Sequence, residues 1–255
     1  MNFLEQILSE KAKEVAEMPL EMPGKVRKTT GFVRRLQEHP EYLQVIGEVK
    51  RASPSLGAIN MAVDVLQQAK SYEIAGVSAI SVLTDPVFFK GNIEDLKLVA
   101  KNVDLPVLNK DFIIDKKQIN RAVNAGATII LLIVAALEPE QLRELFNYAT
   151  ACGLEVLVEV HNQAELAIAH EIKANLIGIN NRNLKTFEVS LQTSLDLVPN
   201  QLADCFYISE SGIKSATEAA LVAKHYRAVL VGEALMKDGN PKKAAKALQV
   251  LRDVD

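Results

Sequence analysis

Cysteine is scarce in this chain of 255 residues, which contains only Cys152 and Cys205. The two lie far apart and form neither a CxxC motif nor the framework of a disulfide-rich protein. Such usage is typical of a protein of the reducing cytoplasm. The four histidines also lack the spacing of a metal site such as HExxH. We therefore expect no structural or catalytic metal, and we interpret His161 as a surface or structural residue.

Long apolar runs and an excess of one charge are also missing. No segment approaches the ~20 apolar residues that a membrane helix needs. The N-terminal segment MNFLEQILSEKAKEVAEM lacks the apolar region of a secretory signal. The net charge of −3 and the isoelectric point of about 5.9 do not indicate nucleic acid as the main partner. We expect neither a membrane nor a nucleic acid to be a partner.

What the sequence does contain is a repeated alternation of short apolar segments with amphipathic ones of helical length. Amphipathic segments lie at 61–76, 115–127, 138–153 and 215–225, with Asp115 and Ser215 placed as N-caps and Gly153 as a helix stop. Eight apolar segments have the length of strands, at residues 42–50, 78–84, 105–110, 128–135, 155–160, 176–180, 205–209 and 228–232.

This alternation predicts parallel strands joined by right-handed helical crossovers. Eight strand–helix units in a chain of this length match the (β/α)8 TIM barrel, an α/β fold. The alternative is a doubly wound open sheet, but its GxGxxG fingerprint does not follow the first strand segment. We therefore expect a barrel.

Residues 1–41 precede the first strand segment, and we expect them to form an N-terminal helical extension packed on the barrel. Phe3, Leu4, Ile7 and Leu8 have helical spacing, and a segment rich in proline and glycine separates two short helices. Residues 42–255 would form the barrel itself, in a single domain overall. The acidic isoelectric point and the extension favour a monomer.

Charged residues stand at the carboxyl ends of several strand segments, where barrels build their active sites. The first segment ends in Glu48 and Lys50, the third in Lys110 and the fifth in Glu159. Each of these residues shares its strand face with an apolar residue two or four positions earlier. If those faces point inward, two ammonium groups and two carboxylates meet at the barrel mouth and offer a general acid and a general base.

The last two strand segments end differently, in the sequences SESG and VGEA. Their glycines precede expected helix starts, where backbone N–H groups and the helix dipole favour an anion. Barrels often bind a phosphate after their seventh and eighth strands, so we expect a phosphate ester as a small-molecule substrate. Alone, each feature has a simpler explanation, since a lysine at a strand end is usually ion-paired and glycines often serve only turn geometry.

Six segments in order, GEVKRASPSLG, LNKDFIID, LVEVHN, GINNRNLKTF, SESGI and VGEALM, resemble the motifs of the indole-3-glycerol phosphate synthase family. The resemblance covers nearly the whole chain. It implies a carboxy-lyase of tryptophan biosynthesis that converts 1-(2-carboxyphenylamino)-1-deoxyribulose 5-phosphate into indole-3-glycerol phosphate. The substrate closes a ring and then loses CO2 and water, and the family uses no cofactor or metal.

The resemblance also assigns roles to individual residues. Lys110 would protonate the ketone oxygen during ring closure, and Glu159 would stabilise or deprotonate the intermediate. Lys50 with Glu48 would serve dehydration, although which lysine acts at which step stays open. Asn180 and Ser211 complete the set. The expected catalytic residues are thus Glu48, Lys50, Lys110, Glu159, Asn180 and Ser211.

Substrate binding is assigned in the same way. Arg182, with Asn180, would hold the anthranilate end, because a planar guanidinium matches a carboxylate. An apolar slot for the aromatic ring would be formed by Phe89, Phe112, Leu131 and Leu184. The phosphate would be bound by Ser53, Ser211, Gly212, Gly232 and the backbone at Glu233, and Pro54 is included among the substrate-binding residues.

Two positions depart from the family's motifs. Ala234 stands where the family often has serine, so one hydroxyl contact to phosphate is absent, and Asn109 stands where arginine is common but is expected to point away from Lys110. Two other functions stay open from the sequence. One is another phosphate-binding barrel, such as an isomerase of a ribulose phosphate, and the other is a non-catalytic ligand-binding protein.

Overall fold

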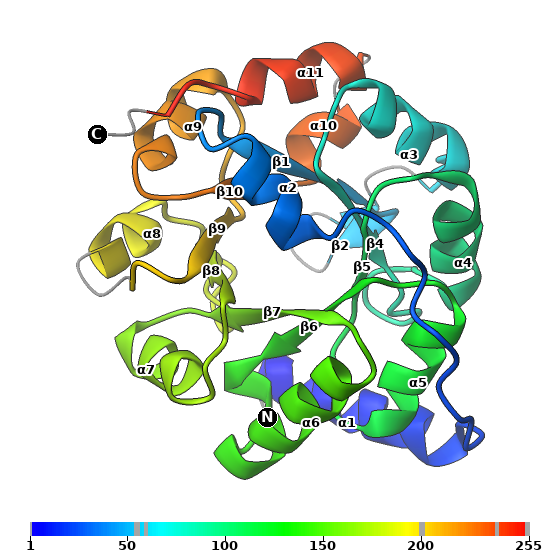
Figure 1. The fold of residues 1–255 in the computed structure, drawn as a ribbon. Coiled ribbons are helices and arrows are strands. Elements are labelled where there is room, and N and C mark those ends of the chain that lie inside the picture. Colours follow the sequence, from blue (N-terminus) through cyan, green and yellow to red (C-terminus); the bar gives the residue numbers. More distant parts are fainter. Residues whose placement is uncertain (1, 54–56, 59–60, 199–201, 238–239, 253–255) are drawn as a thin grey trace.

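The computed structural model describes residues 2–53, 57–58, 61–198, 202–237 and 240–252. Within these ranges, eight parallel strands close into a barrel in the order β1-β10-β9-β8-β7-β6-β5-β4 (Figure 1). The expected barrel is therefore confirmed. Its strands are β1 (Gln44–Val49), β4 (Ala79–Leu83), β5 (Val107–Lys110), β6 (Ile129–Ile133), β7 (Glu155–Val160), β8 (Leu176–Asn180), β9 (Phe206–Glu210) and β10 (Ala228–Val231).

Helices follow the strands and surround the barrel (Figure 1). A short antiparallel pair, β2 (Ala52–Ser53) with β3 (Gly57–Ala58), and the 3-10 helix η1 (Val134–Ala136) are inserted after β1 and β6. The surrounding helices are α3 (Val65–Ile74), α4 (Ile93–Asn102), α5 (Lys116–Asn124), α6 (Pro139–Ala151), α7 (Gln163–Glu171), α8 (Gln192–Leu197), α9 (Ala216–Ala223), α10 (Glu233–Lys237) and α11 (Pro241–Leu248).

Local signals in the sequence set several of these helix ends. The side chains of Asp115 and Ser215 cap α5 and α9 as expected. Gly153 follows the end of α6 with φ of 90°, a left-handed conformation that glycine adopts without strain. The segment 61–76 is helical only over α3, because Asp64 caps the helix and accepts a hydrogen bond from the backbone N–H of Gln67.

The two faces of each strand serve two apolar clusters. Residues that point outward, such as Val45, Val107, Val156 and Tyr207, pack under the surrounding helices. Residues that point inward fill the barrel, among them Ile46, Leu108, Leu131, Leu157, Ile208 and Leu230. Because side chains alternate along a strand, the residues at the carboxyl ends of the inward faces reach the barrel mouth.

The N-terminal extension contacts both ends of the barrel. Its second helix, α2 (Phe32–Glu38), lies across one opening in Figure 1, and its side chains Phe32 and Leu36 are fully buried within the inner cluster. Burying each contributes about 1.5–3 kcal/mol. The first helix, α1 (Phe3–Glu17), lies against α5, where Lys117 donates hydrogen bonds to the backbone carbonyls of Val15 and Met18.

A barrel residue completes the start of α2. Gly31 precedes this helix and has no side chain to cap it. Instead, the carboxylate of Glu155, at the start of β7, accepts hydrogen bonds from the backbone N–H groups of Phe32 and Val33 at 2.7 and 2.9 Å. Both groups would otherwise lack an intrahelical partner. Among the described helices, none has the length and apolar character required to cross a membrane.

Replacing this cap tests how firmly α2 is held. We expect Glu155→Ala to lower the free energy of unfolding by ~1–2 kcal/mol, the usual effect of removing a helix cap. Urea denaturation measures the change. Glu171→Ala, at the exposed end of α7, is the control and should have little effect. Equal stabilities of the two variants would show that Glu155 does not hold α2.

Candidate active site

A cavity opens at the carboxyl ends of the barrel strands. Pro54 lies outside the described residues, but every other residue expected at the site lines this cavity: Glu48, Lys50, Ser53, Phe89, Lys110, Phe112, Leu131, Glu159, Asn180, Arg182, Leu184, Ser211, Gly212, Gly232 and Glu233. The barrel thus brings together residues that are spread over most of the sequence.

Glu48 and Lys50 form an ion pair at the end of β1. Lys50 Nζ lies 2.6 Å from Glu48 Oε1, and the glutamate is buried. Burial alone would raise the pKa of Glu48, but the ammonium groups of Lys50 and Lys110 hold it below its usual value. Gly232 leaves space for the pair, since a Cβ there would lie 2.5 Å from Glu48 Oε1 and 3.0 Å from Lys50 Nζ. The glutamate is therefore ionised at neutral pH.

Lys110 ends β5 and lies between two carboxylates. Its Nζ is 3.3 Å from Glu159 Oε2 and 3.3 Å from Glu210 Oε2. Burial would lower the pKa of Lys110, but the nearby carboxylates of Glu210 and Glu159 raise it above its ordinary value. The side chain thus presents a fixed ammonium group to the cavity at neutral pH.

Glu210 is a third carboxylate at the cavity, and it is not among the site residues expected from the sequence. It ends β9 on the same face as Ile208, so strand alternation could have identified it. Gly178 makes room for it, because a Cβ there would lie 2.0 Å from Glu210 Oε1. Burial raises the pKa of Glu210 to about 8, even though the ammonium of Lys110 opposes this shift. At neutral pH this carboxyl group therefore carries a proton.

His161 is a second residue whose position the sequence did not reveal. It is part-buried, with Nε2 3.3 Å from Glu159 Oε1 and Nδ1 2.9 Å from Glu165 Oε2. Burial would lower the pKa of His161, but Glu159 and Glu165 raise it to about 10, so the imidazole is charged at neutral pH. Of the two alternatives, surface or structural, the contacts fit the structural one, because the ring joins α7 to the carboxylate of Glu159.

Glu159 is consequently held in its ionised form. Burial alone would raise its pKa, but Lys110 and the charged ring of His161 lower it below the usual range, with a further contribution from Asn180. Glu159 and Glu210 therefore differ in protonation at neutral pH although both lie beside Lys110. Two carboxyl groups with separated pKa values can act as a base and an acid in the same cavity.

The carboxyl ends of β8 and β9 are joined through an amide. Asn180 Oδ1 accepts hydrogen bonds from Ser211 Oγ at 2.9 Å and from the backbone N–H of Arg182 at 3.0 Å. Ser211 has φ of 66°, an unusual value for a residue with a side chain, and Asn181 Nδ2 donates to its carbonyl at 3.0 Å. Arg182 Nη1 donates to the carbonyl of Phe187 at 3.2 Å. These contacts fix the turn that leads into Gly212.

Apolar side chains also line the cavity. The rings of Phe89 and Phe112 lie with their centroids 6.1 Å apart. Leu131 and Leu184 also line this region, as do three residues of α1 that the sequence did not indicate: Phe3, Leu4 and Ile7.

The two departures from the family's motifs lie outside the cavity lining. Ala234 packs against the outer apolar cluster. Asn109 is turned away from Lys110, as expected, and donates a hydrogen bond from Nδ2 to Thr84 Oγ1 at 2.7 Å. Among the described residues, no group of three or more His, Cys, Asp or Glu side chains could hold a metal ion.

The raised pKa of Glu210 predicts a pH-dependent stability. Between its ordinary pKa of 4.5 and about 8, the folded protein keeps a proton that the unfolded chain releases. This contribution to the free energy of unfolding is therefore complete below pH ~4.5 and is lost as the pH rises toward ~8, by at most ~1.4 kcal/mol per pH unit. Glu210→Gln removes it.

Urea denaturation of both proteins at a series of pH values measures this effect. We expect the stability of Glu210→Gln relative to the unmodified protein to increase from about pH 5 to about pH 8 and then to level off. Glu171→Gln, an exposed glutamate, is the control and should show no such trend. A difference that does not vary with pH would mean that Glu210 titrates as an ordinary carboxyl group.

Comparisons with known proteins identify the family of the chain. The chain matches the model of the family "Indole-3-glycerol phosphate synthase" over residues 4–248. It is 62% identical over 252 residues to the indole-3-glycerol phosphate synthase of Lactococcus lactis subsp. lactis (strain IL1403), covering 98% of this chain and 96% of that protein. It is 59% identical over 252 residues to the protein of the same name from Listeria welshimeri serovar 6b, covering 99% and 100%.

Solved structures of other enzymes share the fold. A 3-hexulose-6-phosphate synthase aligns with a TM-score of 0.65 at 17% identity, covering 81% of this chain and 98% of that chain. The enzyme of that name from Salmonella typhimurium aligns with a TM-score of 0.64 at 14% identity, covering 81% and 96%. At such low identity these likenesses concern the barrel alone. By contrast, the two relatives at about 60% identity align over almost the full length of both chains, and the family model matches residues 4–248. The chain therefore belongs to the indole-3-glycerol phosphate synthase family.

Proposed function

We propose that the cavity at the barrel mouth carries out the reaction of this family through Lys110, Glu159, Glu210, Lys50 and Glu48. The family's enzymes are carboxy-lyases of tryptophan biosynthesis, and the substrate is 1-(2-carboxyphenylamino)-1-deoxyribulose 5-phosphate. The observation that carries the proposal is the fixed ammonium of Lys110 between two buried carboxyl groups of different protonation.

Ring closure requires an acid at the ketone oxygen. The ring carbon that bears the carboxylate attacks the ketone carbon, aromaticity is lost and negative charge develops on the oxygen. Lys110 donates a proton to that oxygen, and its ammonium interacts more strongly with the developing charge than with the neutral ketone. Glu210, protonated and 3.3 Å away, is placed to return a proton to Lys110.

Decarboxylation and dehydration follow. Loss of CO2 returns an electron pair to the ring system, and the hydroxyl group then leaves as water after receiving a proton. Lys50, paired with Glu48 at 2.6 Å, provides that proton, and the ionised Glu159 removes a proton as the indole ring becomes aromatic. The fixed positions of these groups contribute by orientation as well as by charge.

The two ends of the substrate are bound by different sets of residues in the cavity. Phe89, Phe112, Leu131 and Leu184 enclose the aromatic ring, and Arg182, which together with Asn180 lines the same cavity, binds its carboxylate. The phosphate lies near the carboxyl ends of β9 and β10, which are followed by glycines. It is bound there by Ser53, Ser211, Gly212, Gly232 and the backbone of Glu233.

We further propose that the chain acts as a monomer in the cytoplasm, with residues 1–41 and 42–255 in one domain. Support comes from the free thiols of Cys152 and Cys205 and from the burial of α2 against the barrel. Light scattering at micromolar concentration tests the monomer, and a single urea transition followed at both α2 and the barrel tests the single domain.

Turnover tests the function directly. The purified chain is mixed with the carboxyphenylamino-deoxyribulose phosphate in the presence of a chelator, and indole fluorescence is followed. A rising signal supports ring closure without a chelatable metal. Binding of the substrate without turnover would instead favour the ligand-binding protein, and isomerisation of a ribulose phosphate would favour the other enzyme class.

Removing the proposed acid should affect the chemical step. We expect Lys110→Ala to lower kcat by ~1,000-fold or more, with a much smaller change in KM, because its ammonium acts mainly in the transition state. Lys97→Ala, exposed on α4, is the matched control and should leave both constants unchanged. A rise in KM with kcat preserved would assign Lys110 to substrate binding.

Arg182 should show the opposite behaviour. We expect Arg182→Ala to raise KM by at least ~10-fold with a smaller change in kcat, because the guanidinium contacts a carboxylate that is present in the ground state. Steady-state kinetics over a wide range of substrate concentration measures both constants. A loss confined to kcat would contradict this role.

A further inference from the structure

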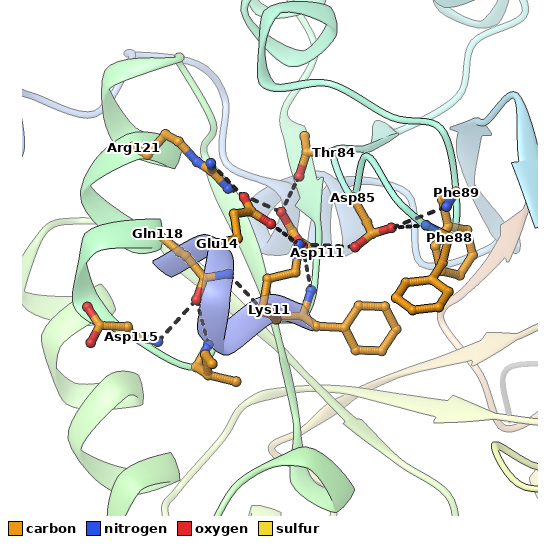
Figure 2. Close-up of polar contacts among 12 residues, drawn as sticks. Lys11, Glu14, Thr84, Asp85, Phe88, Phe89, Asp111, Asp115, Gln118 and Arg121 are labelled. Atoms are coloured by element: carbon orange, nitrogen blue, oxygen red, sulfur yellow. Dashed lines mark hydrogen bonds and ion pairs between the residues drawn. The ribbon is translucent and has the colours of Figure 1, made fainter. Parts of the chain in front are cut away.

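A third ammonium group, more deeply buried than those of Lys50 and Lys110, lies outside the catalytic set. Lys11 is on α1, and its side chain is only 1% exposed. Its Nζ lies 2.8 Å from Asp111 Oδ1, 3.1 Å from Asp85 Oδ2 and 2.7 Å from Glu14 Oε2 (Figure 2). None of the steps above uses this group, and Lys11 does not line the cavity.

The first of its barrel partners organises the loop after β4. Asp85 is 2% exposed, and its Oδ1 accepts hydrogen bonds from the backbone N–H groups of Phe88 at 2.6 Å and Phe89 at 3.2 Å (Figure 2). Its other oxygen faces Lys11. The carboxylate therefore links the ammonium group to the backbone that places the ring of Phe89.

The second partner organises the loop after β5. Asp111 directly follows Lys110, and its Oδ1 accepts a hydrogen bond from the backbone N–H of Phe112 at 2.8 Å. Its Oδ2 accepts one from Thr84 Oγ1 at 2.6 Å and lies 3.5 Å from Arg121 Nη2. One ammonium group thus joins the two loops that place Phe89 and Phe112.

The charges of this cluster leave little freedom for movement. Three carboxylates, those of Glu14, Asp85 and Asp111, face two cations, Lys11 and Arg121. Burial would lower the pKa of Lys11, but Asp111 and Asp85 raise it above its ordinary value, so the group stays charged at neutral pH. Separating a buried charge from its partners is costly, and the two loops are therefore held at a fixed spacing.

We propose that Lys11 is a positioning residue for the aromatic end of the substrate: by tying Asp85 to Asp111 it fixes the distance between Phe89 and Phe112. The inference rests on the proposed function of the cavity, in which these rings enclose the anthranilate. Through this ion cluster, α1 sets the distance between two rings that belong to the loops after β4 and β5. The rings contact the substrate in the ground state as well as in the transition state, so a change in their spacing is measurable as a change in KM and Kd.

The first variant is Lys11→Met, which keeps an unbranched side chain only one atom shorter and removes the charge. The matched control is Lys13→Met on the same helix, where the lysine is 66% exposed and pairs with Glu10. Two probes report on the two ends of the cavity. Fluorescent N-methylanthranilate reports on the aromatic slot, and inorganic phosphate, measured as a competitive inhibitor, reports on the opposite end.

For Lys11→Met we expect KM to rise about tenfold with kcat changed by less than about threefold. The Kd of N-methylanthranilate should rise by a similar factor, while inhibition by phosphate and all properties of Lys13→Met stay unchanged. A lower melting temperature with KM and both probe affinities unchanged would overturn the proposal, because Lys11 would then only anchor α1. Equal weakening of both probes would overturn it too.

Asp85→Asn provides a test if Lys11→Met does not fold. The amide oxygen can still accept from Phe88 and Phe89, but its pairing with Lys11 is lost. We expect a smaller rise in KM and in the Kd of N-methylanthranilate, again without a change for phosphate. Unchanged affinities in this variant would overturn the proposal. If the unmodified protein neither turns over substrate nor binds N-methylanthranilate, the proposed function itself fails.

Discussion

The ammonium group of Lys110 lies at 3.3 Å from the carboxyl groups of both Glu159 and Glu210, and the chemistry proposed for the cavity depends on this contact. A buried charge without a partner would be strongly destabilising, so the barrel supplies carboxylates from β7 and β9. At neutral pH one of these is ionised and the other protonated. The cluster is then close to neutral overall while it still contains an acid and a base.

Residues outside the cavity lining also influence the charges of these carboxyl groups. His161 is charged and joins Glu159 to Glu165 on α7, so a helix outside the barrel stabilises the ionised form of an inward-facing carboxylate. Gly178 and Gly232 take part through the space that they leave for Glu210 and for the pair of Glu48 with Lys50. At these two positions the absence of a side chain leaves the space that the charged groups occupy at the mouth of the barrel.

The N-terminal extension is held by different kinds of interaction at the two ends of the barrel. At one end, α2 buries Phe32 and Leu36 in the inner apolar cluster, and Glu155 caps the helix. At the cavity end, α1 contributes apolar side chains and the buried ammonium of Lys11. Apolar burial has no preferred direction, whereas the ion cluster fixes the loops after β4 and β5 in one arrangement. The end with the cavity therefore has the more directional contacts.

The sequence by itself determined the fold, because the alternation of strand and helix segments admits few topologies and the polar strand ends mark one face of a barrel. It also determined which residues of each strand share a face, since side chains alternate strictly. Its motifs indicated the family. Alternation alone also places Glu210 on the same strand face as Ile208, but the resemblance does not include it among the site residues.

Only the tertiary structure decided the rest. The protonation of Glu210 depends on burial and on the distance to Lys110, which no local pattern contains. The roles of His161 and Lys11 depend on partners from other elements: Lys11 meets Asp85 and Asp111 only after α1 has docked. Electrostatic interactions act through space at a few ångströms, so residues distant in sequence acquire their chemistry from neighbours that the closed barrel provides.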